Sequence, residues 1–343
     1  MKMKATTIYG LNDVRLDLVD KPKAGPGEVL VEVKVATTCG TDVKSVVRGR
    51  PGDTFPRRLG HGELAGVVAE VGEGVTRFRV EQRIVAHNTA PCFECRMCLK
   101  GRFQLCENLV FGRGAYQEYY CVPSPIVKIN MFEIPENITF EEAAQLEPFS
   151  CAVCGAAASN IEVGDTVAVI GSGAQGLYFL KLAKLYGAVK VIMLDHSDYR
   201  LKFAKKFGAD EVINNGEEDA VKRVKELTEG NGADVVIAAA GVPSAWEEAV
   251  KITARGGLVN EYAGCAPGSV FTVPTERTHY DMIKIIGTFH TTPSYVQEAW
   301  KLIRTRTVDL RPIVTHKMPL DDIKEAFNIL ATSMEAIKIG IVP

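Results

Sequence analysis

The sequence predicts an α/β protein that combines a β-rich domain with a doubly wound parallel sheet. Short runs of alternating apolar and polar residues dominate the first third of the chain, whereas strands and helices alternate from Asp165 onward. The length of 343 residues suits two domains, and 46% hydrophobic with 24% charged residues is an ordinary globular composition. That composition excludes a disordered chain, a collagen and a coiled coil.

Short strands are expected in the first third of the chain. Apolar side chains recur at a period of two over residues 14–18 and 29–35, and the Pro- and Gly-rich segment 21–27 separates the two runs as a turn. A further strand over 64–71 is interrupted by Gly66, as at a bulge or a close approach of two backbones. This region predicts a compact antiparallel β domain.

Helices and strands alternate after residue 139. Thr139, followed three residues later by Glu142, forms a capping box that opens a helix running towards Leu146. Strands are expected at 166–170, 189–194, 234–239, 257–263 and 283–288, with 234–239 as the third. The helices between these strands are expected to end at Gly187, Gly208 and Gly230. Such alternation produces right-handed crossovers and a parallel sheet. The final 55 residues return to mixed strand and helix.

Charge and hydropathy argue against two classes of partner. Lys and Arg total 40 against 42 Asp and Glu, so a net charge of −2 offers no basic field for nucleic acid. The longest uncharged stretch, residues 166–180, has 15 residues and three glycines, which is too short for a membrane span. The first ten residues lack the apolar core of a secretory signal. We therefore expect a soluble, cytoplasmic protein.

Four of the nine cysteines form one cluster, Cys92, Cys95, Cys98 and Cys106. An odd cysteine count without a secretory signal argues against a disulfide framework. Four soft ligands close in sequence can form a tetrahedral thiolate cage around zinc. A [4Fe–4S] cluster is the main alternative, because the x2 spacing of three cysteines also suits iron–sulfur. We interpret the cluster as a structural zinc site.

A glycine-rich turn follows the apolar strand 166–170 and opens a helix. In Gly171-Ser-Gly-Ala-Gln-Gly176, Gly171 permits the tight turn, Gly173 lets the backbone approach a pyrophosphate, and Gly176 lets helix and strand pack closely. The helix N-terminus presents N–H groups to the phosphates, and Gln175 lies within the same turn.

Asp195 ends the next strand, 19 residues after Gly176. A carboxylate there accepts hydrogen bonds from ribose hydroxyls and repels a 2′-phosphate, so the sequence predicts NAD over NADP. Arg200 lies in the following helix, where its side chain faces either solvent or the edge of the adenine.

A second group of metal-binding residue types, Cys39, His61, Glu63 and Glu147, is dispersed along the chain. Taken singly, each has an ordinary explanation as a buried thiol, a loop histidine or a helix-end carboxylate. Spacing alone does not unite them.

Several motifs together resemble a known family. The chain resembles the zinc-dependent medium-chain alcohol dehydrogenases, and it is most similar to their branch of sorbitol (polyol) and threonine dehydrogenases. The resemblance implies a GroES-like catalytic domain over 1–149 and 289–343, with a structural zinc lobe at about 88–110, and an NAD-binding Rossmann domain over 150–288. It also implies two zinc ions per subunit and a homo-oligomer, with a homotetramer as the default. It is carried by Cys39-Gly-Thr-Asp42, Gly60-His61, the four-cysteine lobe, Gly114-Ala-Tyr-Gln-Glu-Tyr119, Glu147-Pro148 and the glycine-rich turn, in that order.

The resemblance also implies roles for single residues. Cys39, His61 and Glu147 match the ligands of the catalytic zinc, and Thr41 matches the hydroxyl that takes the proton of the alcohol. Zinc lowers the pKa of a bound alcohol, so that the alkoxide can expel hydride to the nicotinamide. Lys338 matches a basic position that neutralises the cofactor pyrophosphate.

Two departures from the family pattern bear on catalysis. Gly62 separates His61 from Glu63, and Glu63 reaches the metal only if a bulge or the extended backbone turns it that way. Lys44 stands where a relay histidine is frequent, and an ordinary lysine with a pKa of about 10.4 is a poor proton acceptor at neutral pH. This substitution predicts an alkaline optimum for alcohol oxidation, with a solvated lysine near the cofactor as the alternative.

The sequence thus predicts an NAD-dependent zinc oxidoreductase acting on a secondary alcohol of a polyol, sugar or sugar phosphate. The substrate class depends on the carboxylate at the third zinc position and on the basic loop 48–58. A threonine-type amino-acid alcohol dehydrogenase is the alternative within the class. A zinc- and NAD-binding protein without turnover is the alternative from another class, whereas the four-cysteine lobe, Cys39 and His61 disfavour a zinc-free quinone or enoyl reductase.

Overall fold

The chain folds into two compact units. The computed structural model describes residues 1–49, 53–333 and 335–343, so part of the basic loop 48–58 lies outside the described residues. The first unit comprises Met1–Ser150 together with Thr291–Pro343, and the second comprises Cys151–His290. Both ends of the chain therefore belong to the same unit.

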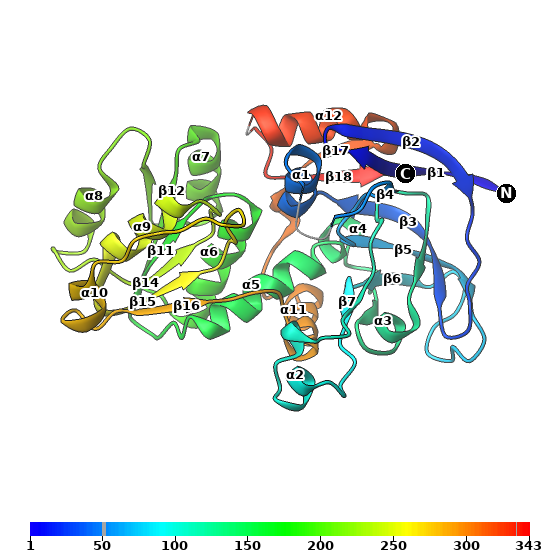
Figure 1. The fold of residues 1–343 in the computed structure, drawn as a ribbon, viewed down its shortest axis with the longest axis horizontal. Coiled ribbons are helices and arrows are strands. Elements are labelled where there is room, and N and C mark those ends of the chain that lie inside the picture. Colours follow the sequence, from blue (N-terminus) through cyan, green and yellow to red (C-terminus); the bar gives the residue numbers. More distant parts are fainter. Residues whose placement is uncertain (50–52, 334) are drawn as a thin grey trace. The chain divides into compact units, whose positions relative to one another are not determined.

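Two sheets form the frame of the first unit. The smaller has the order β2-β1-β4, and the larger has the order β10-β6-β5-β3-β18-β17 with β9 also pairing with β3. β18, drawn in red in Figure 1, lies beside the blue β3 and pairs with it antiparallel. The bounds are β1 (Lys2–Gly10), β2 (Asp13–Asp20), β3 (Val29–Thr37), β4 (Arg57–Arg58), β5 (Leu64–Val71), β6 (Arg83–Ala86), β9 (Tyr119–Val122), β10 (Met131–Glu133), β17 (Val314–Pro319) and β18 (Lys338–Val342).

The core of this unit is formed by side chains on one face of the larger sheet. Val31 and Val33 of β3 and Ile339 and Ile341 of β18 are each at most 3% exposed and belong to one apolar cluster. Each such side chain contributes about 1.5–3 kcal/mol when it leaves water. The C-terminal strand is therefore as much a part of this core as the strand near the N-terminus.

Short helices and turns connect these strands. The predicted capping box is confirmed, because Thr139 Oγ1 accepts from the Glu142 N–H at 3.2 Å and Glu142 Oε2 accepts from the Thr139 N–H at 2.9 Å. The helix it opens ends at Ala143, and a separate helix begins at Leu146. The remaining elements of this unit are α1 (Gly40–Val47), β7 (Thr89–Ala90), α2 (Arg96–Leu99), η1 (Phe103–Leu105), β8 (Val110–Phe111), α3 (Ser124–Ile129), α4 (Phe140–Ala143), the start of α5 (Leu146–Ala158), α11 (Pro293–Arg304), η2 (Arg311–Ile313), η3 (Leu320–Asp322), α12 (Ile323–Asn328) and η4 (Ile329–Ser333).

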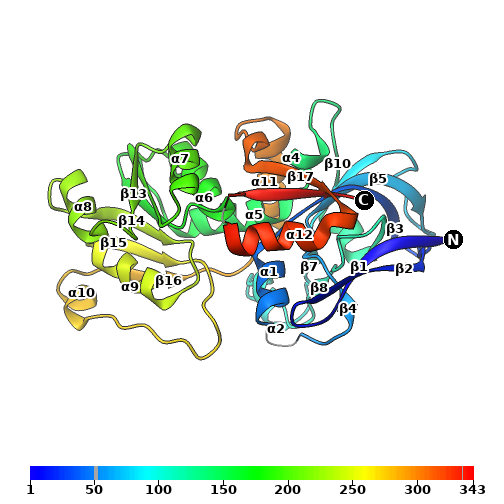
Figure 2. The same cartoon turned by 90° about the horizontal axis from the view of Figure 1, so that it is seen from above.

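A six-stranded parallel sheet forms the second unit, as the alternating pattern predicts. Its order is β13-β12-β11-β14-β15-β16, and Figure 2 shows α6 and α7 on one side of it and α8 and α9 on the other. The bounds are β11 (Thr166–Ile170), α6 (Ala174–Tyr186), β12 (Lys190–Asp195), α7 (Asp198–Phe207), β13 (Glu211–Asn214), α8 (Ala220–Leu227), β14 (Ala233–Ala238), α9 (Pro243–Ile252), β15 (Thr253–Glu261), α10 (Thr275–His279) and β16 (Lys284–Gly287).

The sequence prediction missed one strand of this sheet. The segment counted as the third strand is β14, the fourth, because β13 (Glu211–Asn214) precedes it. β13 is a short edge strand with only two apolar residues, so it lacks the continuous apolar run of a central parallel strand. Gly187 and Gly208 end their helices at φ +106° and +116° as expected, whereas α8 ends at Leu227, before Gly230.

In the described part of the chain, every helix falls short of the length and apolarity that crossing a bilayer requires.

Candidate functional site

The four cysteines of the lobe converge on one point. Their sulfur atoms all lie within 4.8 Å of one another, with separations of 4.0 Å for Cys92–Cys98, 3.9 Å for Cys95–Cys106 and 3.5 Å for Cys92–Cys106. Four sulfurs at about 2.3 Å from a tetrahedral zinc lie about 3.8 Å apart. The lobe therefore has the dimensions of a thiolate cage for one metal ion.

Backbone N–H groups of the lobe point at these sulfurs. The N–H of Cys92 donates to Cys106 Sγ at 3.3 Å, and the N–H of Glu107 donates to Cys95 Sγ at 3.4 Å. Backbone hydrogen bonds, above all that from Cys98, lower the pKa of Cys95 to about 6. Burial raises the pKa of Cys98 to about 12. The fold thus stabilises thiolate at part of the cluster even before a metal binds.

The dispersed ligands predicted from the sequence all lie in the first unit. Cys39 follows β3 and caps α1, where its sulfur accepts from the Thr41 N–H at 3.3 Å. His61 precedes β5, and Glu147 lies in the first turn of α5. His61 Nε2 and Glu147 Oε1 are 4.0 Å apart.

Asn88 connects two of these ligands and was not found by sequence reasoning. Its side-chain amide donates to the backbone oxygen of His61 at 2.6 Å and to Glu147 Oε1 at 3.2 Å. Asn88 is 1% exposed, so both bonds are shielded from water. Such a partner orients a ligand, and its mutation typically weakens metal affinity about 10- to 100-fold. An asparagine between two strands carries no local signal of this role.

The extra glycine between His61 and Glu63 is required by the local geometry. Gly62 has φ +89°, and a Cβ there would lie 2.5 Å from Asn88 Cβ and 2.7 Å from the Gly112 oxygen. Only glycine fits such a position. The turn brings the His61 N–H to Asp42 Oδ2 at 3.2 Å, which fixes the segment against α1.

Glu63 lies buried beside the predicted ligands and pairs with Lys338. Its Oε2 accepts from Lys338 Nζ at 2.5 Å and from the Thr37 hydroxyl at 2.5 Å, and Lys338 also donates to the Thr38 backbone oxygen at 2.7 Å. Lys338 is 3% exposed and Glu63 is 1% exposed. The structure thus places Lys338 in a buried ion pair, because β18 lies between β3 and β17 in the sheet; its contact with a cofactor pyrophosphate stays a prediction.

The charges in this region favour a bound cation. Burial raises the pKa of the Cys39 thiol well above its ordinary value, and the charges of Glu63, Asp42 and Glu147 raise it further. Burial raises the pKa of Glu147 to about 8, with the charge of Glu63 as the next cause. Burial likewise raises that of Asp42 to about 7. The four acidic groups are Cys39, Asp42, Glu63 and Glu147, and Lys338 supplies one positive charge against them. These side chains therefore suit the binding of a divalent metal ion.

The dispersed site is less closed than the lobe. In the described chain, the Cys39, His61 and Glu147 ligand atoms are not all within 4.8 Å of one another. Thr41 lies in the first turn of α1 beside Cys39, and Lys44 lies in the last turn; both are half-buried.

The glycine-rich turn has the conformation that its sequence predicts. Gly171 follows β11 at φ +103°, and Gly173 caps the N-terminus of α6. A Cβ on Gly176 would lie 1.8 Å from the Gly171 oxygen, which explains the third glycine as a helix–strand contact. Gln175 Oε1 accepts from the Tyr262 hydroxyl at 2.8 Å.

Asp195 lies at the carboxyl end of β12 and is 5% exposed. It accepts from the N–H groups of Ser172 at 2.7 Å and Ser197 at 2.9 Å, so it joins the glycine-rich turn to the start of α7. Arg200 lies in α7 and is half-buried, with no hydrogen-bond partner for its buried Nε among the described residues. The turn, Asp195 and Arg200 all belong to the second unit.

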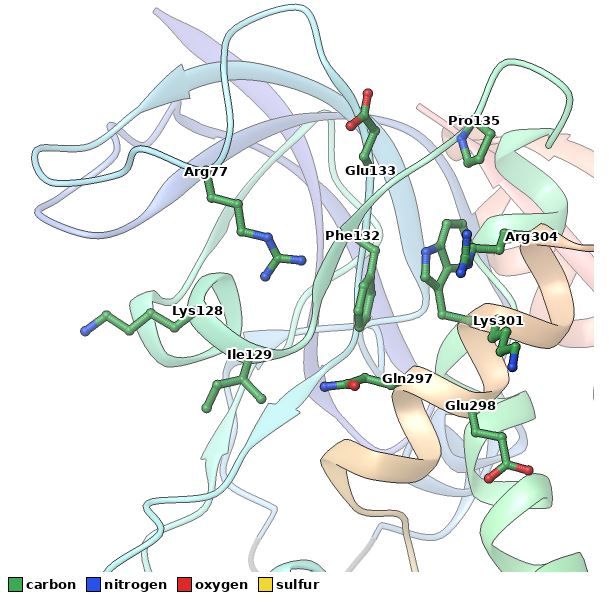
Figure 3. Close-up of a pocket in the computed structure, with 11 residues that line it drawn as sticks. Arg77, Lys128, Ile129, Phe132, Glu133, Pro135, Gln297, Glu298, Lys301 and Arg304 are labelled. Carbon is green, nitrogen blue, oxygen red and sulfur yellow. The ribbon is translucent and has the colours of Figure 1, made fainter.

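A large open groove lies elsewhere on the first unit (Figure 3). It has a volume of about 1010 Å³ and contains none of the predicted site residues. Phe132 and Trp300 stack there with ring centroids 5.9 Å apart, and the Arg77 guanidinium lies 5.9 Å from the Phe132 ring. The size of a groove therefore does not identify the catalytic site of this protein.

Two family models match separate parts of the chain. The family model "Alcohol dehydrogenase GroES-like domain" matches residues 25–131, and "Zinc-binding dehydrogenase" matches residues 174–305. L-threonine 3-dehydrogenase of Pyrococcus furiosus is 34% identical over 344 aligned residues, covering 96% of this chain and 94% of that protein. The chain belongs to the zinc-dependent medium-chain alcohol dehydrogenases.

Other members of this dehydrogenase family are similarly close. Sorbitol dehydrogenase of Bacillus subtilis is 31% identical, covering 99% of this chain and 97% of that protein. A zinc-binding dehydrogenase of Sinorhizobium meliloti, solved with bound NADP, matches with a TM-score of 0.92 and 28% identity over 100% of both chains. These findings confirm the predicted GroES-like and Rossmann architecture. This dehydrogenase is an oxidoreductase that uses a nicotinamide dinucleotide.

Proposed function

We propose that this dehydrogenase oxidises a secondary alcohol of a polyol, sugar or sugar phosphate with NAD as the hydride acceptor. The observation that carries the proposal is the ligand set of the first unit, in which Glu147 Oε1 lies 4.0 Å from His61 Nε2 and Asn88 holds both residues. A Cys, a His and a Glu leave one coordination position for the substrate oxygen. The resemblance to sorbitol dehydrogenase points to the same class of substrate.

Residues of this chain have distinct roles in the proposed reaction. Cys39, His61 and Glu147 would hold the catalytic zinc, which as a Lewis acid would favour the deprotonated form of an alcohol. The Thr41 hydroxyl accepts the proton of the alcohol and passes it outward, with Lys44 one turn further along α1 as the next acceptor at alkaline pH, where a lysine is neutral. Glu63 stays beside the ligands, because Lys338 and Thr37 hold one of its oxygens.

We further propose NAD as the preferred dinucleotide. Asp195 is a buried carboxylate at the end of β12, and it disfavours the extra phosphate of NADP by charge repulsion. The Sinorhizobium meliloti relative binds NADP, so the preference needs its own test. Ratios of kcat/KM for NAD and NADP in the wild type and in Asp195→Ala provide it. A lower ratio in the variant supports the proposal, and an unchanged ratio contradicts it.

Threonine is the second candidate substrate. L-threonine 3-dehydrogenase of Pyrococcus furiosus is 34% identical to this chain, and that identity is the observation in favour. Threonine also carries a secondary alcohol, so the same ligand set serves both reactions. Initial rates of NAD reduction with sorbitol, xylitol, ribitol, a hexitol phosphate and L-threonine separate the two candidates, because polar contacts in a pocket discriminate strongly between hydroxyl and ammonium groups.

Zinc content decides whether the protein turns over substrate at all. We propose two zinc ions per subunit, one in the lobe and one at Cys39, His61 and Glu147. Elemental analysis of chelator-free protein should find both, and His61→Ala should lose one zinc ion together with most of the rate of NAD reduction. One zinc ion in the wild type, with no rate on any alcohol, would instead support a zinc- and NAD-binding protein without turnover.

The remaining proposals concern domain roles, assembly and compartment. We propose that residues 1–149 and 289–343 act as the catalytic domain and residues 150–288 as the dinucleotide-binding domain. β16 is an edge strand, and Tyr280, Met282 and Phe289 near it are each at least 67% exposed, which supports a homo-oligomer, with a homotetramer as the default. Light scattering tests the assembly.

No disulfide joins any of the nine cysteines, which supports a reducing compartment such as the cytoplasm.

A further inference from the structure

A buried carboxylate at the end of β15 has no role in the site described so far. Glu261 is the last residue of this strand and is 6% exposed. Neither of its carboxylate oxygens has a hydrogen-bond partner among the described residues. Burial raises its pKa to about 7. Native proteins rarely leave a buried acceptor unpaired, and the exceptions often mark a functional site.

The neighbouring polar residue shows that the strand otherwise satisfies its polar groups. The Asn260 amide donates to the Gly155 oxygen at 3.0 Å and to Ser159 Oγ at 2.8 Å, and its Oδ1 accepts from the Thr288 hydroxyl at 2.8 Å. Successive side chains of a strand point to opposite faces, so Glu261 lies on the other face from Asn260. Among the described residues, the fold therefore provides hydrogen-bond partners for the Asn260 side chain and none for the Glu261 carboxylate.

The position of Glu261 in the sheet relates it to the dinucleotide. In open parallel sheets a ligand binds at the carboxyl ends of the strands, where the strand order reverses. The reversal here falls at β11, which has β12 on one side and β14 then β15 on the other (Figure 1). Asp195 ends β12 and takes the adenosine half, so the nicotinamide half extends over the ends of β14 and β15. Glu261 ends β15.

A hydrogen bond connects this strand end to the glycine-rich turn. Tyr262, the residue after Glu261, donates its hydroxyl to Gln175 Oε1 at 2.8 Å. Gln175 lies between Gly173, the glycine at which the backbone can approach the pyrophosphate, and Gly176, which lets helix and strand pack closely. The segment that carries Glu261 is thus held against the cofactor turn within the same unit.

We propose that Glu261 binds the nicotinamide carboxamide, accepting a hydrogen bond from its N–H2 group and so orienting the ring. The inference rests on the proposed function, because it requires that the second unit binds a nicotinamide dinucleotide. The carboxamide is the donor that the nicotinamide base itself offers, and the ribose hydroxyls are the other donors of that half. A carboxylate acceptor for an amide N–H2 is a charge-assisted bond, which is stronger than a neutral one.

The test compares three ligands on the wild type and on Glu261→Met. NAD carries the carboxamide, 3-acetylpyridine adenine dinucleotide replaces its N–H2 by a methyl group, and ADP-ribose lacks the nicotinamide but keeps the ribose. Dissociation constants are measured by calorimetry on the zinc-loaded protein. We expect the wild type to prefer NAD over the acetyl analogue about tenfold or more, and Glu261→Met to reduce that preference to about twofold or less. ADP-ribose affinity should stay the same.

Several results would overturn the assignment. An unchanged preference for NAD over the acetyl analogue in Glu261→Met would show that Glu261 does not read the carboxamide. An equal loss of affinity for all three ligands, ADP-ribose included, would assign Glu261 to the ribose or to the fold. If the wild type binds none of the three ligands, the proposed function fails, whereas normal ADP-ribose binding without any preference removes only this inference.

A matched variant controls for loss of a carboxylate in the same unit. Glu248 of α9 is half-buried, but its carboxylate accepts from the Asn215 amide at 2.8 Å. Glu248→Gln should leave the ratio of the two dinucleotide affinities unchanged, and a change there would overturn the inference. Glu261→Gln provides a second variant of nearly native shape, and we expect an intermediate preference, because an amide oxygen is a weaker acceptor than a carboxylate.

Discussion

The lobe and the dispersed site place similar ligands in different surroundings. In the lobe, four sulfurs from residues 92–106 lie within 4.8 Å of one another, and backbone N–H groups already favour thiolate. In the dispersed site, Cys39, His61 and Glu147 come from three distant segments and include groups whose pKa values burial raises. A closed ligand set suits a structural metal, and an open one suits a metal that must exchange ligands. We therefore expect the lobe to affect the stability of the first unit and the dispersed site to affect the reaction.

The largest effect is expected from opening the lobe. Cys98→Ser should release one zinc ion per subunit and lower the melting temperature strongly, because structural zinc contributes about 10–16 kcal/mol to folding in small zinc domains. Zinc analysis and thermal unfolding measure both. The control is Cys121→Ser, a half-buried thiol of the same unit outside the lobe. If Cys98→Ser keeps the stability of the wild type, the lobe is not a structural metal site.

A smaller loss should follow from breaking the ion pair beside the dispersed site. Lys338→Met leaves the Glu63 carboxylate buried and unpaired, which costs about 3–5 kcal/mol of unfolding free energy. Adding Glu63→Gln should recover part of the loss, and denaturant titration measures both variants. Lys4→Met provides the control, because Lys4 pairs with Asp321 in an exposed bridge worth at most about 1 kcal/mol. Equal losses for the two lysines would contradict a buried pair.

The dispersed site should affect rate more than stability. His61→Ala should lower kcat/KM about 10²- to 10³-fold, the size found when one group that stabilises transition-state charge is removed elsewhere. Its melting temperature should change far less than that of Cys98→Ser. Steady-state kinetics measure kcat/KM of His61→Ala, and thermal unfolding compares its melting temperature with that of Cys98→Ser. A melting temperature as low as that of the lobe variant would make both sites structural and erase the contrast.

The smallest effect concerns Glu261, a carboxylate that belongs to neither the lobe nor the dispersed site and whose pKa is raised by burial. The folded-state pKa of Glu261 is about 7, above its ordinary value of 4.5, so the folded protein holds this proton more tightly than the unfolded chain. The contribution of Glu261 to stability is therefore full below about pH 4.5 and is lost as the pH rises through 7. Glu261→Gln should flatten the decline of the unfolding free energy over this window, and an identical slope would contradict it.

Sequence reasoning succeeded where the signal is local. The cysteine lobe, the glycine-rich turn and the capping box at Thr139 each occupy a few consecutive residues, and their chemistry depends on that spacing. The parallel sheet also follows from local apolar runs. The edge strand β13 was missed because its four residues carry too little apolar character to stand out.

Sequence reasoning failed where the structure depends on contacts between distant segments. Asn88 meets Glu147 across 59 positions, and Lys338 meets Glu63 across 275. No periodicity relates such residues, so their pairing follows only from the strand order. Family resemblance brought Cys39, His61 and Glu147 together, but the role suggested for Lys338 did not anticipate its burial.

The division of the first unit between both ends of the chain constrains how the protein is made. Residues 151–290 are continuous, so the second unit can fold as soon as it leaves the ribosome. The first unit has to wait, because β3 lacks its neighbour β18 until residues 338–342 have been synthesised. During that interval Ala36 and Thr37 of β3 lack the strand that pairs with them, and an unpaired strand edge can pair with another chain. Slow or interrupted synthesis of residues 291–343 therefore prolongs the time during which this edge can pair with another chain.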